Sequence, residues 1–575
     1  MISLSEFAGT APRIAPSALA EDLATEATNV GFDEGVLTGA LCSTRANPDF
    51  AGLPATTRAI ARPTASGAKL AFTWRSKGGA FANLLAPSDM WGRIYSLQYV
   101  SLNRKYRAVF TTKDHYSETG VTIDPTSYSL GIPRPWWPPR VVTVAIDKSQ
   151  YDTVEERTAP DGTVSNVVVS ADIKLDMQKT AYVYTMVDAY GHEGVPSLAS
   201  DVIDLPFDAP FRVDIEFPPQ TLVSANLEGG LRRLYRAAFD GTTSEWQFVA
   251  DVPWTQLQYS DHLPLGQEGE AIVSGDWAEP PFMEDLAVVN GSFLASFEDN
   301  RVSYSAYLLP HAWPESTRFP LPHKIVAIKS TLGGLFIGTR GTPYWASGVD
   351  PTAAVPINLG ANYPCLSADS VVDMGGYVLY ASHDGLVSAS ADGVSLVSTE
   401  FVDRLRWLRD FAPENIKAFG HEGDYYFSVG QQWWVFSPSN GRGLRKITFK
   451  DITPGQLRQV FYDAERDTTM LLRTDGVVFD IVSQQDSSLR FTWLSKEFRQ
   501  PPVGYSTGQV LSTEYPVTLI VEADGEQLSY EATSERPFRL SAIGRCTRWR
   551  LGVDAGATAR VMRLAVSQSP MELMT

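Results

Sequence analysis

The amino-acid sequence predicts an all-β protein with few short helices. Its 575 residues include 44 Gly and 37 Pro, which mark many turns, and 11% of the residues are aromatic. Apolar and polar residues alternate over 69–78, 92–101 and 105–114, which is the period of a half-buried strand. A Gly turn followed by an apolar strand also recurs, at spacings of 42, 48 and 53 residues. We therefore predict an irregular β-propeller, an inserted fibronectin-III-like β-sandwich and a small C-terminal β unit.

Residues 1–135 are expected to form an N-terminal helix and the first propeller blades. Apolar residues at helical spacing predict the helix over 17–29, and a turn and a strand follow over 30–37. The segment 131–140 then contains four prolines, whose fixed φ prevents the continuation of a helix or a central strand. We place a domain boundary there.

Residues 136–275 are expected to form the inserted β-sandwich. The segments 141–147, 165–175 and 180–197 have strand patterns, and 231–252 has two strands joined across Asp240 and Gly241. An Asp-Gly pair between alternating runs favours a hairpin, because Gly tolerates the positive φ of the turn.

Residues 276–505 are expected to supply the remaining blades, and 506–575 the C-terminal unit that closes or flanks them. The repeated plan appears at 333–339, 375–381, 422–428 and 473–479. An amphipathic helix over 401–416, ending before Pro413, interrupts it. Closure of short sheets into a ring removes exposed strand edges, so we expect both ends of the chain to share one ring of six to eight blades.

Charge and cysteine content restrict the function classes. The formal net charge is −18, which argues against a protein that grips nucleic-acid phosphates. The three cysteines are far apart and form no C-x-x-C, so neither a zinc ribbon nor a disulfide scaffold is supported. The N-terminus has no signal-peptide pattern and no apolar run reaches membrane-spanning length, so we expect a soluble chain made in a reducing compartment.

Motifs for catalysis, cofactors or metals are not evident in the sequence. The seven histidines show no HxH or HExxH spacing, and neither a P-loop nor a G-x-S-x-G elbow occurs. The segment 382–385 is the nearest match to the sialidase box S-x-D-x-G-x-T-W, and it fails in spacing and at the Thr-Trp end. The aromatic pairs 136–137, 425–426 and 433–434 are expected to place one ring in a core and the other at a sheet or subunit contact.

Several segments, in this order and spacing, together resemble the nozzle proteins (tail tubular protein B) of short-tailed bacteriophages. They lie at 7–13, 24–29, 35–37, 106–112, 131–133, 135, 234–236, 248–250, 259–261, 300–305, 310–314, 325–328, 335–338, 341–344, 365–367 and 493–498. Within them the structural signature positions are Phe7, Gly9, Pro12, Asn29, Gly35, Tyr106, Pro133, Tyr235, Arg236, Ser305, His311, Ala312, Trp313, Pro314, Gly338, Pro343, Tyr344, Ser495 and Lys496.

The resemblance implies a virion structural protein without enzymatic activity, catalytic residues, metal or cofactor. It would form a homo-oligomeric ring, usually a hexamer, in the tail of the virion after assembly in the bacterial cytoplasm. Its partners would be the portal-adaptor connector, tail fibres or spikes, and viral DNA and ejection proteins that pass through the lumen without specific binding. The alternatives are another tail component, such as an adaptor or receptor-binding protein, and a propeller glycosidase acting on host surface polysaccharide.

The acidity has two interpretations. An acidic subunit repeated around a channel would repel DNA and so let it pass, because charges act across about 10 Å at ordinary salt. Alternatively, the net charge of −18 merely keeps a large subunit from aggregating.

Overall fold

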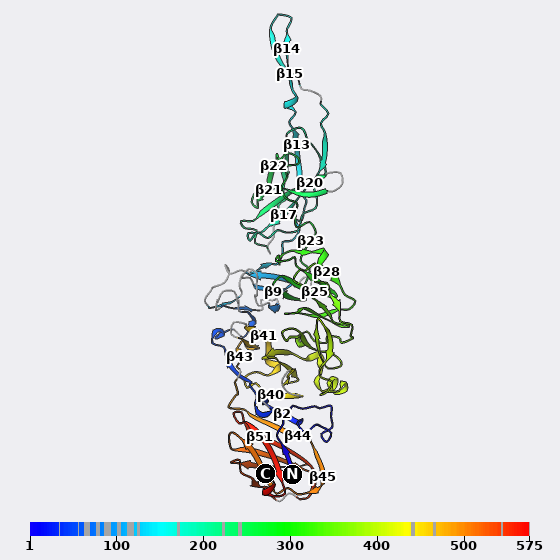
Figure 1. Cartoon of the computed structure of the whole chain (residues 1–575). Coiled ribbons are helices and arrows are strands. Elements are labelled where there is room, and N and C mark those ends of the chain that lie inside the picture. Colours follow the sequence, from blue (N-terminus) through cyan, green and yellow to red (C-terminus); the bar gives the residue numbers. More distant parts are fainter. Residues whose placement is uncertain are drawn as a thin grey trace.

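The structure is a computed structural model that describes the whole chain except residues 34, 54, 56, 62–69, 76–80, 85–93, 101–104, 112–119, 124–126, 170–172, 221–224, 240–243, 439–442, 464–466, 483, 542–543 and 574–575. It confirms the all-β prediction, with one short α-helix, α1 (Arg404–Arg406), continued by a π-helical segment, Trp407–Phe411. The molecule is elongated: the insertion (residues 136–275) forms one end, and both termini lie at the other end (Figure 1).

The central body contains three consecutive four-stranded antiparallel sheets. The first contains β24 (Asp285–Val289), β25 (Phe293–Glu298), β26 (Arg301–Tyr304) and β28 (Arg318–Pro320); the second β29 (Ile325–Thr331), β30 (Gly334–Thr339), β31 (Tyr344–Ala346) and β32 (Ile357–Asn358); the third β33 (Val372–Asp373), β34 (Val378–Ala381), β35 (Leu386–Ser390) and β36 (Gly393–Leu396). The strands of each sheet pair in chain order, and most are joined by short turns, whereas longer segments connect β26 to β28 and β31 to β32.

Strands from the N-terminal region complete the next two sheets. β2 (Ala24–Thr28) pairs with β40 (Leu444–Ile447), the last of the run β37 (Ala418–His421), β38 (Asp424–Val429), β39 (Gln432–Phe436) and β40. β5 (Ser43–Ala46) pairs with β43 (Val478–Val482), which follows β41 (Leu457–Asp463) and β42 (Thr468–Arg473). The two ends of the chain are therefore joined by backbone hydrogen bonds.

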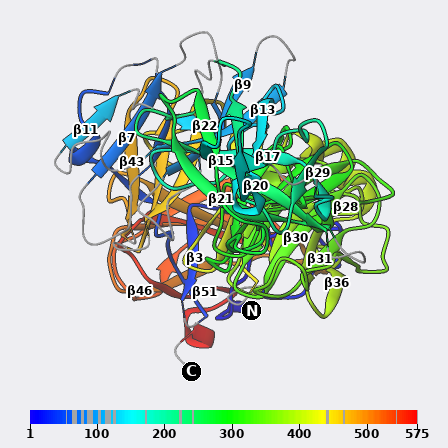
Figure 2. The same ribbon diagram turned by 90° about the horizontal axis from the view of Figure 1, so that it is seen from above.

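Two further sheets precede the insertion. One contains β6 (Thr57–Ala61), β7 (Leu70–Arg75) and β11 (Gly120–Ile123); the other β8 (Phe81–Leu84), β9 (Ile94–Val100), β10 (Lys105–Thr111) and β12 (Tyr128–Ser129). Successive sheets contact one another in a cyclic order. β24 contacts β29, β29 contacts β33, and β33 contacts β37; β37 then contacts β42 of the fifth sheet, whose β41 contacts β6. β6 contacts β8, and β8 contacts β24 again. Seen along the long axis, β7 lies beside β43, and β29 to β36 lie on the other side (Figure 2).

The insertion contains two three-stranded antiparallel sheets around one apolar core. The first is β13 (Arg140–Ile146), β19 (Phe211–Glu216) and β22 (Gln258–Asp261); the second is β17 (Tyr182–Val187), β20 (Leu231–Phe239) and β21 (Ser244–Pro253). The predicted hairpin is present as β20 and β21, although its Asp240–Gly241 turn lies outside the described residues. Two ribbons complete the insertion: β16 (Met177–Thr180) with β18 (Ile203–Pro206), and β14 (Thr153–Thr158) with β15 (Val164–Val169).

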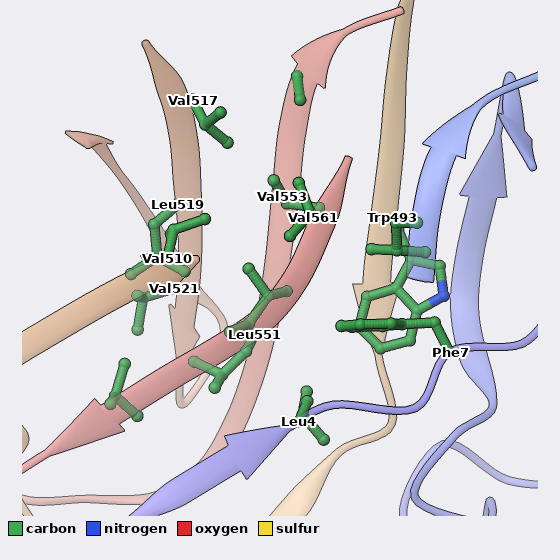
Figure 3. Packing of buried hydrophobic residues seen from close by; sticks show 14 of the residues in the cluster. Leu4, Phe7, Trp493, Val510, Val517, Leu519, Val521, Leu551, Val553 and Val561 are labelled. Atoms are coloured by element: carbon green, nitrogen blue, oxygen red, sulfur yellow. The ribbon is translucent and has the colours of Figure 1, made fainter. Parts of the chain in front are cut away.

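The opposite end, which we call the base, combines C-terminal and N-terminal strands. Its strands are β44 (Arg490–Ser495), β45 (Phe498–Val503), β46 (Thr507–Ser512), β47 (Val517–Ala523), β48 (Glu526–Ala532), β49 (Phe538–Arg539), β50 (Cys546–Gly556) and β51 (Val561–Ser567), with β1 (Ile2–Leu4), β3 (Val30–Asp33) and β4 (Val36–Gly39). The side chains between its sheets form the largest buried cluster in the described chain (Figure 3). Leu4, from β1, belongs to the same cluster as Leu551 and Val561 from the C-terminal strands.

The predicted helix over 17–29 is wrong. The segment before β2 forms turns, and Ala24–Thr28 is a strand that pairs with β44. The Thr25 hydroxyl lies 2.9 Å from the carbonyl oxygen of Ser495 and donates to it. Helix propensity is a weak preference, and the pairing with β44 overrides it here. The second predicted helix is present over 404–411, close to the expected position.

Candidate functional site

The signature positions at the base hold the N-terminal segment against the C-terminal sheets. The Phe7 ring meets the Trp493 ring edge-on at 5.0 Å between centroids (Figure 3), and the Trp493 indole N–H donates to the carbonyl oxygen of Ala8 at 2.9 Å. The hydroxyl of Ser495 accepts from the backbone N–H of Leu551 at 2.9 Å. Lys496 places its ammonium 5.6 Å from the Phe498 ring. The two contacts of Trp493 join residues almost 500 positions apart in sequence.

Asn29 and two glycines shape the connection between the base and the central body. Asn29 has a φ of 54°, and its side-chain oxygen accepts from the backbone N–H of Thr448 at 2.8 Å. Gly9 lies so close to Gly443 that a Cβ at Gly443 would come 2.7 Å from the Gly9 carbonyl carbon. Gly35 has a φ of 80° in the turn between β3 and β4, a conformation that Gly adopts without strain.

A second group of signature residues joins the central body to the insertion. Trp313 and Ala312 are fully buried, and Trp313–Pro314 forms β27, which pairs with β23 (Trp277–Ala278). The imidazole of His311 stacks on that of His192 from the insertion at 4.4 Å. His192 also contacts the Asp188 carboxylate through Nδ1 at 2.9 Å. The Ser305 hydroxyl accepts from the backbone N–H of Leu294 within the first central sheet.

Inside the insertion, Tyr235 and Arg236 belong to a buried charge network. Arg236 is fully buried and donates to Asp261 at 2.7 Å and to Glu268 at 3.0 Å. Burial opposes its charge, but the neighbouring carboxylates outweigh this effect and raise the pKa of Arg236 above its ordinary value. The Tyr235 hydroxyl donates to Glu193 at 2.7 Å, and burial, followed by that carboxylate, raises the pKa of Tyr235.

The remaining signature positions occupy separate places. Gly338 lies in β30, where a Cβ would come 2.9 Å from the Cβ of Cys365, and Tyr344 is buried in β31 of the same sheet. Pro133 lies in the Pro-rich segment, which forms neither strand nor helix, and Tyr106 lies in β10, where its side chain is outside the described part of the chain. The other two are Pro12, which lines a pocket near the base, and Pro343, which precedes β31. The signature residues therefore do not converge on one site: some lie at connections between parts of the column, and others lie within a single sheet or within the insertion.

The aromatic pairs follow the alternation rule only in part. Trp433 is buried and Trp434 half-buried, as predicted. Tyr425 and Tyr426 are both buried, because β38 is covered on both faces by separate clusters. Trp136 and Trp137 are both 60% exposed, so the prediction is wrong there, because their segment is not a strand and no alternation applies.

The segment 382–385, the nearest match to the sialidase box, forms a hydrogen-bonded turn with an ion pair. Ser382 and Gly385 are joined by a backbone hydrogen bond in the turn before β35, and Asp384 pairs with Arg404 at 2.9 Å. Among the described residues, no group of three His, Cys, Asp or Glu side chains is placed to hold a metal ion. Burial raises the pKa of Cys42 and of Cys365 to about 12, which leaves both thiols protonated at neutral pH.

A pocket of about 320 Å³ lies between the N-terminal segment and the helical segment 404–411. Its lining includes Arg406, Lys446 and Trp434, and the Lys446 ammonium lies 5.4 Å from the Trp434 ring. The lining also includes Glu26, so the pocket carries charges of both signs. None of its described lining residues is a His, Cys or Ser. The sequence analysis did not find this pocket, because its residues come from segments about 400 positions apart.

The acidic excess is concentrated at one end of the molecule. Residues 141–275 contain 21 Asp and Glu against 8 Lys and Arg, a net charge of −13 out of −18 for the whole chain. These residues make up all of the insertion except 136–140, and they lie at the end of the column opposite the base (Figure 1). The column therefore has one strongly acidic end.

Comparisons with known proteins leave the family open. No protein-family model matches the sequence, and no curated protein matches it. Among solved structures, AztD of Citrobacter koseri is similar over 66% of this chain and 99% of its own, with 10% identity and a TM-score of 0.24. Its apo form gives 11% identity, 65% and 98% coverage, and a TM-score of 0.22. The extracellular domain of the putative hybrid two-component system BT4673 from B. thetaiotaomicron gives 8% identity, 90% and 86% coverage, and a TM-score of 0.19.

Candidate membrane spans were sought among the helices of the described residues. None of those helices has the length and apolar character needed to cross a bilayer.

Proposed function

We propose that the chain is a virion structural protein that forms the ring-shaped tail nozzle of a short-tailed bacteriophage. Copies would assemble around a channel that extends the portal and adaptor, retains packaged DNA and conducts it during ejection. The observation that carries the proposal is the acidic end of a long all-β column, with 21 acidic against 8 basic residues in the segment 141–275 of the insertion. A wall of this charge repels phosphates and favours passage over binding.

The proposed body is a seven-bladed β-propeller. The cyclic order of contacts from β24 through β29, β33, β37, β42, β41, β6 and β8 back to β24 supports it. The pairing of β5 with β43 supports closure by strands from both ends of the chain. The inserted β-sandwich is supported by two three-stranded sheets that share one core.

The distribution of charge also supports a conduit. Charge that served only solubility would be spread over the surface, whereas the 440 residues outside 141–275 carry 45 acidic and 40 basic residues, a net charge of −5. The base and the insertion each have a buried core, and His311 of the central body stacks on His192 of the insertion, which supports a rigid column.

Electron microscopy of the purified protein, alone and mixed with its portal and adaptor, tests the proposal. Coaxial rings with a central passage are expected. Peripheral projections would instead indicate a fibre or receptor-binding component, and loss of polysaccharide viscosity with the isolated chain would indicate a glycosidase.

A DNA-binding measurement tests the charge argument separately. Fluorescence anisotropy with a short DNA duplex at 50 and 200 mM salt should show no binding by the unaltered protein. A variant with Asp176, Asp201 and Asp208 replaced by Lys, which changes the net charge of residues 141–275 from −13 to −7, should bind more than the unaltered protein at 50 mM and lose that gain at 200 mM, because phosphate contacts are salt-dependent. Tight binding by the unaltered protein would contradict the proposed role of the acidic end.

A further inference from the structure

A two-stranded ribbon, which we call the arm (residues 153–169), projects from the end of the insertion (Figure 1). Its strands β14 and β15 pair only with each other within the described chain, through six antiparallel residue pairs. The connecting turn is ordered by two backbone hydrogen bonds, from Ala159 to Thr163 at 2.8 Å and from Gly162 to Ala159 at 2.9 Å. Where the arm joins the rest of the insertion, the Tyr151 hydroxyl donates to the carbonyl oxygen of Asp208 at 2.7 Å. The arm is thus a formed and anchored element.

The arm exposes apolar side chains that a solitary ribbon would not retain. Val154 and Val168 face each other in the register, and Val164 lies further along the same face. These three side chains are 64%, 61% and 60% exposed. An isolated two-stranded ribbon is marginally stable in water, and its two outer edges have unpaired backbone groups. Both features indicate that the arm is covered in the assembled state.

The two edges of the arm differ in charge. β14 carries Glu155, Glu156 and Arg157, whereas β15 has the sequence VSNVVV without any charge. A neutral, β-branched edge is the kind that recruits another strand, whereas charged side chains protect an edge. Pairing of β14 with β14 from another copy would bring acidic residues together, and like charges across a strand pair are destabilising. Pairing of the neutral β15 edge of one copy with β14 of another copy avoids this repulsion.

We propose that the arm is an assembly element in which β15 of one copy of this chain pairs antiparallel with β14 of the next copy. This head-to-tail contact uses both free edges of every arm, whereas a β15–β15 contact would leave each β14 edge unpaired and stop at a dimer. Around a closed ring, which the inference takes from the proposed function, the arms form a continuous β collar at the acidic end. Closure of the collar leaves no exposed edge.

Mixing of single-cysteine variants tests the contact directly. Glu155→Cys and Ser165→Cys are made in a chain that also carries Cys546→Ser, because Cys546 is the one partly exposed native thiol among the three cysteines. Each chain then has one arm thiol and cannot cross-link within its own arm. After mild oxidation, size-tagged mixtures should give the mixed disulfide dimer, and neither variant alone should cross-link. Dimers of the Ser165→Cys variant alone would show β15–β15 pairing, and dimers of Glu155→Cys alone would show β14–β14 pairing; either result, or no cross-link, overturns the proposal.

A charge variant tests the asymmetry of the edges. In Ser165→Glu the new carboxylate faces Arg157 in its own arm, so the hairpin is retained, but it adds negative charge beside the acidic β14 of the next copy. Assembly measured by analytical ultracentrifugation should weaken about three-fold per arm contact. The matched control Ser165→Thr, neutral and β-branched, should assemble like the unaltered chain. Equal assembly of the Glu and Thr variants would contradict the proposal.

Deletion of residues 153–169 separates this inference from the proposed function. If the deletion variant forms unchanged rings and the mixture of cysteine variants gives no mixed cross-link, the arm inference fails and the nozzle proposal stands. If the mixed cross-link forms but electron microscopy shows only open chains of molecules, the arm inference stands and the ring proposal fails.

Discussion

Replacement of Arg236 by Met should strongly destabilise the insertion. The Arg236 side chain is fully buried, and it donates to Asp261 at 2.7 Å, to Glu268 at 3.0 Å and to the carbonyl oxygen of Leu263 at 2.9 Å. Both carboxylates are buried, and Asp261 also accepts from the Tyr182 hydroxyl at 2.7 Å. Removal of the guanidinium leaves two uncompensated negative charges, which costs about 3–5 kcal/mol.

Native-state hydrogen exchange of β20 amides measures this loss directly, because it reports the local opening free energy. The opening free energy should fall by about 3–5 kcal/mol in Arg236→Met. Additional Asp261→Asn and Glu268→Gln changes should restore at least half of it, since no unpaired charge then remains.

An ion pair of similar geometry provides the matched control. Arg212 on β19 donates to Asp214 at 2.8 and 3.0 Å but is solvent-exposed, so Arg212→Met should leave exchange unchanged. A loss below about 1 kcal/mol in Arg236→Met, or equal losses in the two single variants, would refute the reasoning about buried charge.

Three further predictions concern packing, thiol reactivity and pH. Gly39→Ala should lower the melting temperature, because its Cβ would lie 2.3 Å from the carbonyl oxygen of Ala557, whereas Gly376→Ala, with open space around it, should not. At pH 8 a thiol reagent should label Cys546 alone in the folded chain, because burial raises the pKa of the other two cysteines to about 12, and labelling of three thiols would contradict this burial. Burial raises the pKa of Asp285 to about 6 in the folded state, so its carboxylate opposes folding as pH rises from about 4 through 6. Asp285→Asn should therefore melt at the same temperature as the unaltered protein near pH 4 and higher above pH 6, and parallel melting curves across this range would exclude the effect.

Local patterns in the sequence predicted the strands well. Alternation located β7, β9, β10 and β17, and the Gly turns located β30, β34 and β38 as the second strands of three successive sheets. The fourth repeat, at 473–479, was out of phase: it precedes β43, the third strand of its sheet. The turn into β42, its second strand, includes Asp467 with a φ of 50° where the other turns have Gly. A Gly-based pattern could not detect that turn.

Contacts between distant segments could not be predicted from such patterns. β1 pairs with β51 through Ile2 and Val566, and nothing in a three-residue apolar strand specifies a partner 564 positions away. The same limitation produced the wrong helix over 17–29, since the partner of β2 is β44. The strand pattern over 165–175 covered most of β15 but not β14, and the exposure of the arm follows from tertiary position and not from alternation.

The position of the acidic residues supports the proposed conduit interpretation of the charge. Exposed charges act across about 8 Å at physiological ionic strength, so acidic residues dispersed over a 575-residue surface would not create a local barrier to DNA. Concentration of a net −13 in one 135-residue segment at the end of a column does create a strong local field. That field also repels neighbouring copies, so a ring with adjacent insertions needs a specific attraction at the same end. The exposed valines and the neutral β15 edge of the arm are placed there, and the proposed β collar would supply that attraction.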